Sequence, residues 1–239
     1  MTSTPTPKIM PLNKDVHGAL KINFENPYAH VAGDHLLPVT AHEFIVAGAE
    51  YPIVFVKNEE KNTYQSVIML GLSSKQNLFV KDGNWQGTYV PVAIRNYPLV
   101  LVHDQNDKDR LLVAVDETSA RVGNDTGEAL FNEDGTESEF LAKRKEHMAE
   151  FLELGQVTTK MIAKLQSLDL LKQQVLTLNV QGEERRINGI YLVDEQKLAD
   201  LDDVTLVELH KNGYLKVIYA HLLSLQHTQK LVLRIAQAS

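Results

Sequence analysis

Cysteine is absent from the 239-residue chain. Its absence excludes catalysis by a thiol, disulfide bonds and zinc sites built on thiolates. The chain also lacks a long hydrophobic run. Its most apolar stretch, YPIVFV at residues 51–56, is far shorter than the roughly 20 residues that a helix needs to cross a bilayer. We therefore expect no membrane span.

An excess of positive charge is also lacking. Asp and Glu number 31 against 24 Lys and Arg, which gives a formal net charge of −7. Nucleic acid and anionic membranes offer no counter-charge to such a surface, so we expect no nucleic-acid partner. The segment 1–15 has no apolar run resembling the core of a signal peptide. This pattern predicts a cytoplasmic location and leaves export to the cell surface by a signal-less route open.

The composition that remains is that of an ordinary globular protein, with 44% hydrophobic and 23% charged residues. Residues 1–12, rich in Ser, Thr and Pro, predict a disordered tail. We expect a single domain over residues 13–239, which is long enough to bury a sizeable core. The polar segment 118–139 contains three glycines and is the predicted lobe boundary or mobile loop.

Short β-rich runs separated by turn signals fill the first half of the chain. Asp82-Gly83 indicates a tight turn, and a polar loop between the last two runs indicates a hairpin. Thr40 followed by Glu43 three residues later is a capping-box pattern, which predicts a short helix ending near Gly48 to Glu50. The predicted strands are 17–24, 51–58, 64–72, 77–85, 99–104 and 110–117.

Helical periodicity dominates the second half. Apolar residues recur at spacings of three, four and seven from about Glu137 to Leu165 and predict a long amphipathic helix. Residues 173–181 and 184–194 return to period two, as in a hairpin around Gly182. The order of these elements predicts an α+β fold with a mainly antiparallel, β-rich N-terminal half, a long amphipathic helix, a hairpin and a helical C-terminus.

The stretch HVAGDHLLPVTAHEF, residues 30–44, concentrates three histidines with an aspartate and a glutamate. A zinc site needs three or four such side chains to converge on one point. His42 and Glu43 are neighbours on the predicted helix and point about 100° apart. No HExxH pattern is present. The sequence therefore predicts neither a metal site nor a cofactor.

Two C-terminal histidines are separated by the geometry of a helix. If residues 214–236 form one helix, His221 lies about 60° from the centre of its apolar face and His227 about 180° from it. They cannot then share a ligand or form a catalytic dyad.

The aromatic residues between positions 77 and 98 suggest a binding surface. They include Trp85, the only tryptophan, and Tyr89. Tryptophan and tyrosine combine a large apolar body with one polar group, which suits a surface that takes a ligand or a partner. The same alternation is also typical of residues that pack a core, and the sequence leaves both interpretations open.

Patterns of known catalytic sites are missing. The chain has no GxSxG elbow and no phosphate-binding glycine loop, and its acidic loops lack ligands at calcium-loop positions. Asp116 and Glu117 end a predicted strand, where neighbouring side chains point to opposite faces, so at most one enters a given cleft. With Glu195 and a histidine, these carboxylates are the candidates for acid–base chemistry.

Several motifs recur along the chain in an order that resembles the SapC-like family, named after bacterial proteins associated with the surface layer. The resemblance spans nearly the whole chain after the tail, so it implies one SapC-like domain, and it brings no established catalytic residue. The motifs are VTAHEFIVAGAEYPIVF, NLFVKDGNWQGTYVPVAIRNYPLVL, VDETSARVGNDTGEALFNEDG, INGIYLVDEQKLADL and GYLKVIYAHLLSLQHTQKL.

The resemblance implies an association with the bacterial surface layer or cell envelope. The first hypothesis is therefore a non-enzymatic binding or assembly protein, with a protein or envelope component as partner. The alternative is an enzyme that acts on a peptide or saccharide through a carboxylate and a histidine. The sequence indicates no oligomeric state. Candidate residues for ligand or partner binding combine the family positions with one histidine of the polar stretch: His35, Glu43, Trp85, Tyr89, Asp116, Tyr191 and Glu195.

Overall fold

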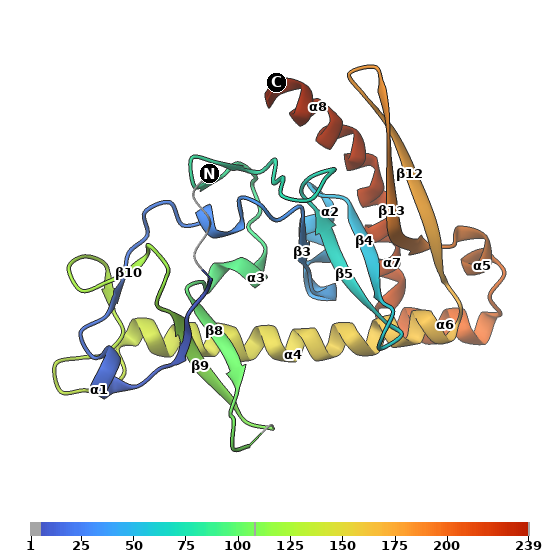
Figure 1. The fold of residues 1–239 in the computed structure, drawn as a ribbon. Helices are drawn as coiled ribbons and strands as arrows, with labels where there is room; N and C mark the ends of the chain where they lie inside the picture. Colours follow the sequence, from blue (N-terminus) through green and yellow to red (C-terminus); the bar gives the residue numbers. More distant parts are fainter. Residues whose placement is uncertain (1–5, 108, 239) are drawn as a thin grey trace. The chain divides into compact units, whose positions relative to one another are not determined.

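The computed structural model describes residues 6–107 and 109–238 (Figure 1). Every strand pair in these residues is antiparallel and the C-terminal part is helical, which confirms the predicted α+β class. The chain forms two compact units. The first unit combines the chain up to Pro27 with Ile94–Leu152, and the second combines Tyr28–Ala93 with the chain from Glu153 onward.

The first unit contains two small sheets. The larger has the order β1-β9-β8, and the polar loop between β8 and β9 forms the predicted hairpin. In the smaller sheet two strands pair with opposite edges of a third, in the order β10-β2-β11. The strands are β1 (Ile9–Pro11), β8 (Leu99–His103), β9 (Leu111–Asp116), β2 (Lys21–Ile22), β10 (Val122–Gly123) and β11 (Glu128–Ala129).

Two expectations for the N-terminal region need correction. The predicted tail 1–12 includes β1, whose backbone pairs with β9; residues 1–5 lie outside the described part. The predicted strand 17–24 is reduced to β2, because Asn13 caps a short helix, α1 (Lys14–His17), by accepting a hydrogen bond from the Asp15 N–H. Local capping thus outweighs strand propensity at this point.

The core of the first unit lies between these sheets and the start of a long helix, α4 (Glu139–Ser167). Ser138, just before the helix, accepts a hydrogen bond from the Leu141 N–H at 3.1 Å, which satisfies one of the free donors of the first turn. The polar segment 118–139 lies within this unit. The buried core residues are Ile22, Leu99, Val115, Leu130, Leu141 and Met148.

The second unit is built on a five-stranded sheet of order β12-β13-β4-β5-β3. The predicted strands at 51–58 and 64–72 form its centre, and their inward side chains are almost fully buried. A two-stranded hairpin turns at Asp82-Gly83, as predicted. The strands are β3 (Leu36–Pro38), β4 (Ile53–Asn58), β5 (Thr63–Met69), β12 (Leu171–Val180), β13 (Glu183–Val193), β6 (Val80–Lys81) and β7 (Asn84–Trp85).

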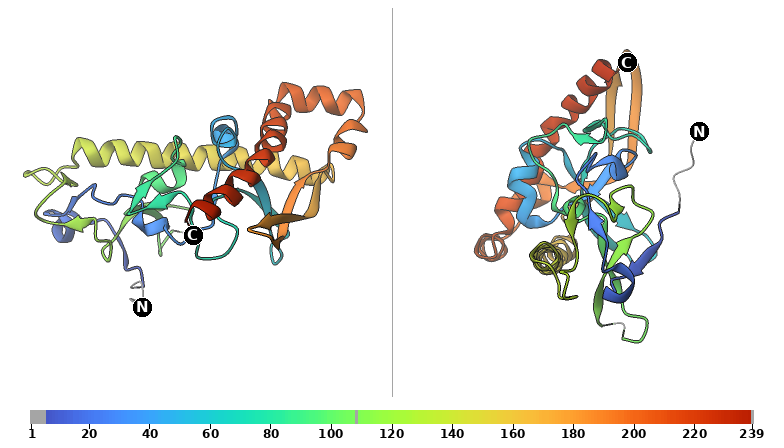
Figure 2. Two further views of the ribbon diagram at one scale, coloured as in Figure 1. Left: turned by 90° about the horizontal axis from the view of Figure 1, so that it is seen from above. Right: turned by 90° about the vertical axis from the view of Figure 1, so that its left-hand side faces the viewer.

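The hairpin of β12 and β13 extends well past the rest of the sheet (Figure 1). Only Ile190 and Tyr191 of β13 pair with β4. The turn at Gly182 has a positive φ of 89°, which glycine adopts without strain. The last helix, α8 (Thr228–Ala238), packs against β12, with Ile235 and Leu178 in one small core (Figure 2).

Helices complete the second unit, together with the part of α4 that follows Leu152. The predicted helix 214–236 is interrupted by the 3₁₀ turn η3, and this turn brings His227 into a buried position instead of the exposed one expected from a continuous helix. No helix in the described residues is long and apolar enough to span a membrane. The remaining helical segments are η1 (Ala29–Val31), η2 (Ala41–Glu43), α2 (Phe44–Gly48), α3 (Val92–Arg95), α5 (Glu195–Ala199), α6 (Asp203–Lys211), α7 (Tyr214–Ser224) and η3 (Leu225–His227).

Candidate functional site

Trp85 is half-buried and its polar group is already engaged. Its Nε1–H lies 3.0 Å from the Tyr51 hydroxyl oxygen and 2.9 Å from the Tyr89 carbonyl oxygen. Its ring contacts Tyr28, Tyr51 and Phe79, with centroids 5.8–6.1 Å apart. The tryptophan therefore holds the 85–89 loop to the core, while its side chain stays partly exposed.

Tyr51 and Glu50 also hold the 85–89 loop in place. Tyr51 is fully buried and donates its hydroxyl hydrogen to the Tyr89 carbonyl oxygen, and burial raises the pKa of this phenol above its usual value. Burial alone would raise the pKa of Glu50, but hydrogen bonds from Thr88 and from the Tyr89 N–H outweigh it and lower this pKa. Tyr51 as a donor and Glu50 as an acceptor thus both hold the loop.

Glu43 is 1% exposed and accepts four hydrogen bonds. Oε2 accepts from the N–H and the hydroxyl of Thr40, both at 2.9 Å, which confirms the predicted capping box. Oε1 accepts from the Tyr89 hydroxyl at 2.8 Å and from the Val92 N–H at 2.9 Å. A carboxylate with this many donors has its lone pairs occupied and is poorly suited to take a proton from a substrate.

The second unit brings three of the candidate residues together and leaves three apart. Trp85, Tyr89 and Glu43 form one hydrogen-bonded chain. His35 precedes β3 at one edge of the sheet, and its carbonyl accepts from the Leu70 N–H at 2.7 Å. Tyr191 lies in β13 with its ring 4.9 Å from that of Tyr64. Glu195 is an exposed residue in the first turn of α5.

Asp116, the candidate residue in the first unit, also has both carboxylate oxygens occupied by hydrogen bonds from the protein. Oδ1 accepts from the Lys8 N–H and from the N–H and hydroxyl of Thr118, and Oδ2 accepts from the Tyr97 hydroxyl at 3.0 Å. Burial would raise the pKa of Asp116, but these donors outweigh it and lower the pKa. The group is held ionised as a structural anchor for the end of β9.

Glu117, its neighbour, pairs with a buried histidine. Its Oε1 lies 3.1 Å from Nε2 of His17, which is only 2% exposed, and Oε2 pairs with the Lys8 ammonium. The pKa of Glu117 is lowered by these partners, Lys8 first. The second ring nitrogen of His17 accepts a hydrogen bond from the Asn13 N–H at 3.0 Å. Both ring nitrogens of this histidine therefore have protein partners.

Two buried polar residues were not singled out by sequence reasoning. Arg121 is 7% exposed and donates to the carbonyl oxygens of Asn23, Pro27 and Tyr97. Ser224 accepts a hydrogen bond from the Ile53 N–H at 2.9 Å. Their partners lie 24 to 171 positions away along the chain, so no local pattern in the sequence could have identified them.

His221 also forms hydrogen bonds with partners that are distant in the sequence. It is fully buried in α7, where its Nδ1 lies 2.8 Å from the Ile53 carbonyl oxygen and its Nε2 accepts from the Val193 N–H at 3.1 Å. These partners define the neutral ring with the proton on Nδ1. Burial lowers the pKa of His221 to about 4. This histidine joins α7 to the ends of two strands.

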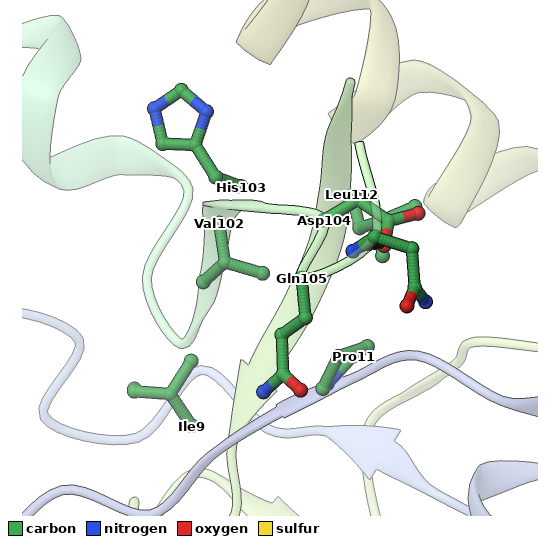
Figure 3. A pocket seen from close by; sticks show the side chains of 8 residues that line it. Ile9, Pro11, Val102, His103, Asp104, Gln105 and Leu112 are labelled. Atoms are coloured by element: carbon green, nitrogen blue, oxygen red, sulfur yellow. Dashed lines mark hydrogen bonds between the residues drawn. The ribbon is translucent and has the colours of Figure 1, made fainter. Parts of the chain in front are cut away.

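A pocket of about 560 Å³ lies on the first unit beside the β8–β9 hairpin loop (Figure 3). Its lining combines apolar and polar side chains. In Figure 3 the Gln105 side chain extends toward Ile9 and Pro11, whereas the His103 ring points away from them. Among the described residues, no group of three or more His, Asp or Glu side chains could hold a metal ion. The pocket residues are Ile9, Pro11, Val102, His103, Asp104, Gln105, Asn106 and Leu112.

The SapC family model matches residues 12–231, nearly the whole chain. No curated protein and no solved structure matches it. The extent of the family match shows that the chain belongs to the SapC family.

Proposed function

We propose that this protein is a non-enzymatic binding or assembly protein associated with the bacterial surface layer or the cell envelope. Membership of the SapC family fits a surface-associated protein. The proposal gives the protein a partner made of protein or envelope material. Fractionation of host cells would distinguish a cytoplasmic pool from one at the surface.

The observation that carries the proposal is a set of exposed apolar side chains on two helices that pack together. Gly48 of α2 lies so close to α7 that a Cβ there would be 3.2 Å from the Ala220 carbonyl oxygen. On these helices Ile45 is 58% exposed and Leu223 is 67% exposed, and Val46 and Tyr219 are also exposed. Exposed apolar side chains on two adjoining helices can serve as an interaction surface. We call these four residues the α2–α7 surface.

The arrangement of the carboxylates supports a role without catalysis. Glu43 and Asp116 each accept four hydrogen bonds from the protein itself. A general base needs an oxygen within hydrogen-bond reach of the substrate proton. In both residues the oxygens are already used to hold loops in place.

A sedimentation assay with envelope material tests the proposal. Purified protein is mixed with surface-layer and cell-envelope fractions of the host, and the bound fraction is measured after centrifugation. We expect saturable binding that the double substitution Ile45→Glu/Leu223→Glu weakens at least about tenfold, because the α2–α7 surface then carries charge where apolar area would be buried.

A matched control separates this effect from a general effect of charge. Val16 is 67% exposed and Val157 is 53% exposed, and neither belongs to the α2–α7 surface. The variant Val16→Glu/Val157→Glu adds the same charge and should bind like the wild type. Absence of binding by the wild type, or equal loss in both variants, would contradict the proposal.

The Glu117–His17 pair favours a second candidate, an enzyme that acts on a peptide or saccharide. The 3.1 Å contact is the carboxylate–histidine geometry that orients a general base. For catalysis Nδ1 of His17 would have to exchange the Asn13 N–H for a substrate. Release of products from peptides or envelope saccharides, abolished by His17→Gln in a variant that remains folded, would favour the enzyme over the binding protein.

A further inference from the structure

Two Asn-Gly pairs occur in the chain. Asn188-Gly189 lies within β13, and Asn212-Gly213 lies at the C-terminal end of α6. Asparagine followed by glycine is prone to deamidation, because glycine has no Cβ to hinder the approach of its backbone nitrogen to the asparagine side chain. The two pairs have the same local chemistry, so any difference in their reactivity comes from how the structure holds them.

The pair in β13 forms a β-bulge. Opposite Val175 of β12, β13 carries two residues, Asn188 and Gly189, instead of one. Gly189 has a φ of 77°, the left-handed conformation of glycine in many bulges. In the described part of the chain, neither residue has a partner in the register with β12 or with β4. The ladder therefore does not fix the backbone at this point.

The reacting groups of this pair are accessible. Asn188 and Gly189 are both exposed, and a Cβ placed on Gly189 would meet no atom within 4 Å. Within residues 6–107 and 109–238, no hydrogen bond holds the Asn188 side-chain amide. The amide can therefore turn toward the Gly189 nitrogen, and water can reach both groups.

The pair at the end of α6 is held in place. Asn212 keeps a helical backbone, with φ −80° and ψ −2°, and its side-chain amide donates to the Glu208 carbonyl oxygen at 2.9 Å. The Gly213 N–H donates to the His210 carbonyl oxygen, also at 2.9 Å. The attacking nitrogen and the leaving amide are thus both bound to carbonyls of the helix, so the end of the helix has to open before they react.

We propose that Asn188 is a site of spontaneous deamidation, and that the bulge selects it over Asn212. The Gly189 backbone nitrogen attacks Cγ of Asn188, the C–N bond of the side-chain amide breaks, and ammonia leaves with the proton of the Gly189 N–H. Water then opens the resulting succinimide ring at one of its two carbonyl carbons. The product is aspartate or isoaspartate, and the reaction involves no oxidation or reduction.

The bulge also accommodates the product. Isoaspartate lengthens the main chain by one atom, which would disturb the alternation of a regular strand, whereas a bulge already contains an unpaired residue. The reaction adds a negative charge to the exposed part of the hairpin, in a chain with a formal net charge of −7. It is independent of the proposed envelope binding and lies outside the α2–α7 surface.

Peptide mapping measures both sites in one sample. The protein is kept at mildly alkaline pH, digested briefly with trypsin and analysed by mass spectrometry. The pairs fall in separate peptides, INGIYLVDEQK and NGYLK. We expect the first to deamidate at least about tenfold faster, because two hydrogen bonds have to break at Asn212. In urea, where both pairs are unfolded, the two rates should become similar.

Variants check the assignment in the intact protein by isoelectric focusing. The wild type should develop a more acidic band with time and keep its circular dichroism spectrum. Asn188→Gln should not develop the band, since glutamine would have to close a larger ring, which forms much more slowly. Asn212→Gln is the matched control and should develop the band like the wild type.

Three results would overturn the proposal. The first is an Asn188 that stays unmodified in the folded protein while the chain in urea reacts. The second is an equal rate at the two sites in the folded protein. The third is an acidic band that develops equally in Asn188→Gln. Loss of the circular dichroism spectrum as the band develops would contradict accommodation of the product by the bulge.

Discussion

Glu43 illustrates how single residues are used in this protein. One of its oxygens accepts from Thr40 and caps the start of a helix, and the other accepts from Tyr89 and from Val92 at the start of α3. The same carboxylate thus serves a local cap and a tertiary contact. Asp116 plays the corresponding part in the first unit, where it holds Lys8, Tyr97 and Thr118.

Replacing Glu43 by Gln should destabilise the protein by about 2–4 kcal/mol. The amide keeps the size of the side chain but presents N–H donors to at least one pair of existing donors. Chemical unfolding monitored by circular dichroism would measure the loss. Glu195→Gln, an exposed carboxylate, should change the free energy of unfolding by less than about 0.5 kcal/mol. Equal effects of the two substitutions would contradict the anchoring role of Glu43.

Helix α4 shows how an element combines opposing preferences. It runs for 29 residues, although Gly155 in its middle weakens it by about 1 kcal/mol relative to Ala. Its polar side chains also form tertiary contacts. The Thr158 hydroxyl accepts a hydrogen bond from the Ala41 N–H at 2.8 Å and donates to the Leu154 carbonyl at 2.7 Å. Packing and hydrogen bonds of this kind compensate for the glycine.

Substitution of Gly155 by Ala should therefore stabilise the protein by about 1 kcal/mol. A Cβ at this position meets no atom within 4 Å, so the gain in helix propensity is not offset by a clash. Gly87→Ala is the contrasting case, because its Cβ would lie 2.7 Å from the Trp85 Nε1. Thermal unfolding of both variants should show opposite shifts, and a loss of stability in Gly155→Ala would contradict the expectation.

At the scale of the whole molecule, each compact unit is assembled from two separate segments of the chain. The stability of such an assembly depends on contacts between residues far apart in sequence. His221 makes one of these contacts in the second unit, where it joins α7 to β4 and β13. Because it is held neutral by burial, its contribution depends on pH.

The free energy of unfolding should fall as the pH is lowered from about 6.5 to about 4. Burial lowers the pKa of His221 from 6.5 to about 4, so in this window the unfolded chain binds a proton that the folded chain does not. The stability is present above pH 6.5 and is lost toward pH 4, on the order of 3 kcal/mol in all. Urea unfolding at a series of pH values measures the slope.

Variants identify the source of this slope. His221→Gln should be less stable at pH 7 but should depend less on pH, so that its curve approaches that of the wild type near pH 4. His227, whose pKa burial also lowers, keeps its own contribution in both proteins. The exposed His210→Gln should run parallel to the wild type. A wild-type slope retained in His221→Gln would contradict the assignment.

Much of the fold could be predicted because its signals are local. Period-two runs indicated β4, β5 and the hairpin of β12 and β13, and Asp82-Gly83 and Gly182 marked their turns. The capping box at Thr40 and the long helix α4 follow from spacings of three and four residues. Such patterns report which face of an element is buried, since side-chain direction repeats with the period of the backbone.

The sequence by itself determined the longer elements, their turns and the family resemblance. Only the tertiary structure decided which polar groups have their hydrogen-bonding capacity filled by the protein and which strands lie at the edges of the sheet. The Tyr89 hydroxyl reaches Glu43 across 46 positions, and His221 reaches Ile53 across 168. The order of strands likewise placed β12 at the end of its sheet. Contacts between residues so far apart in the sequence depend on how distant segments pack, and the local spacing of residues carries no information about that packing.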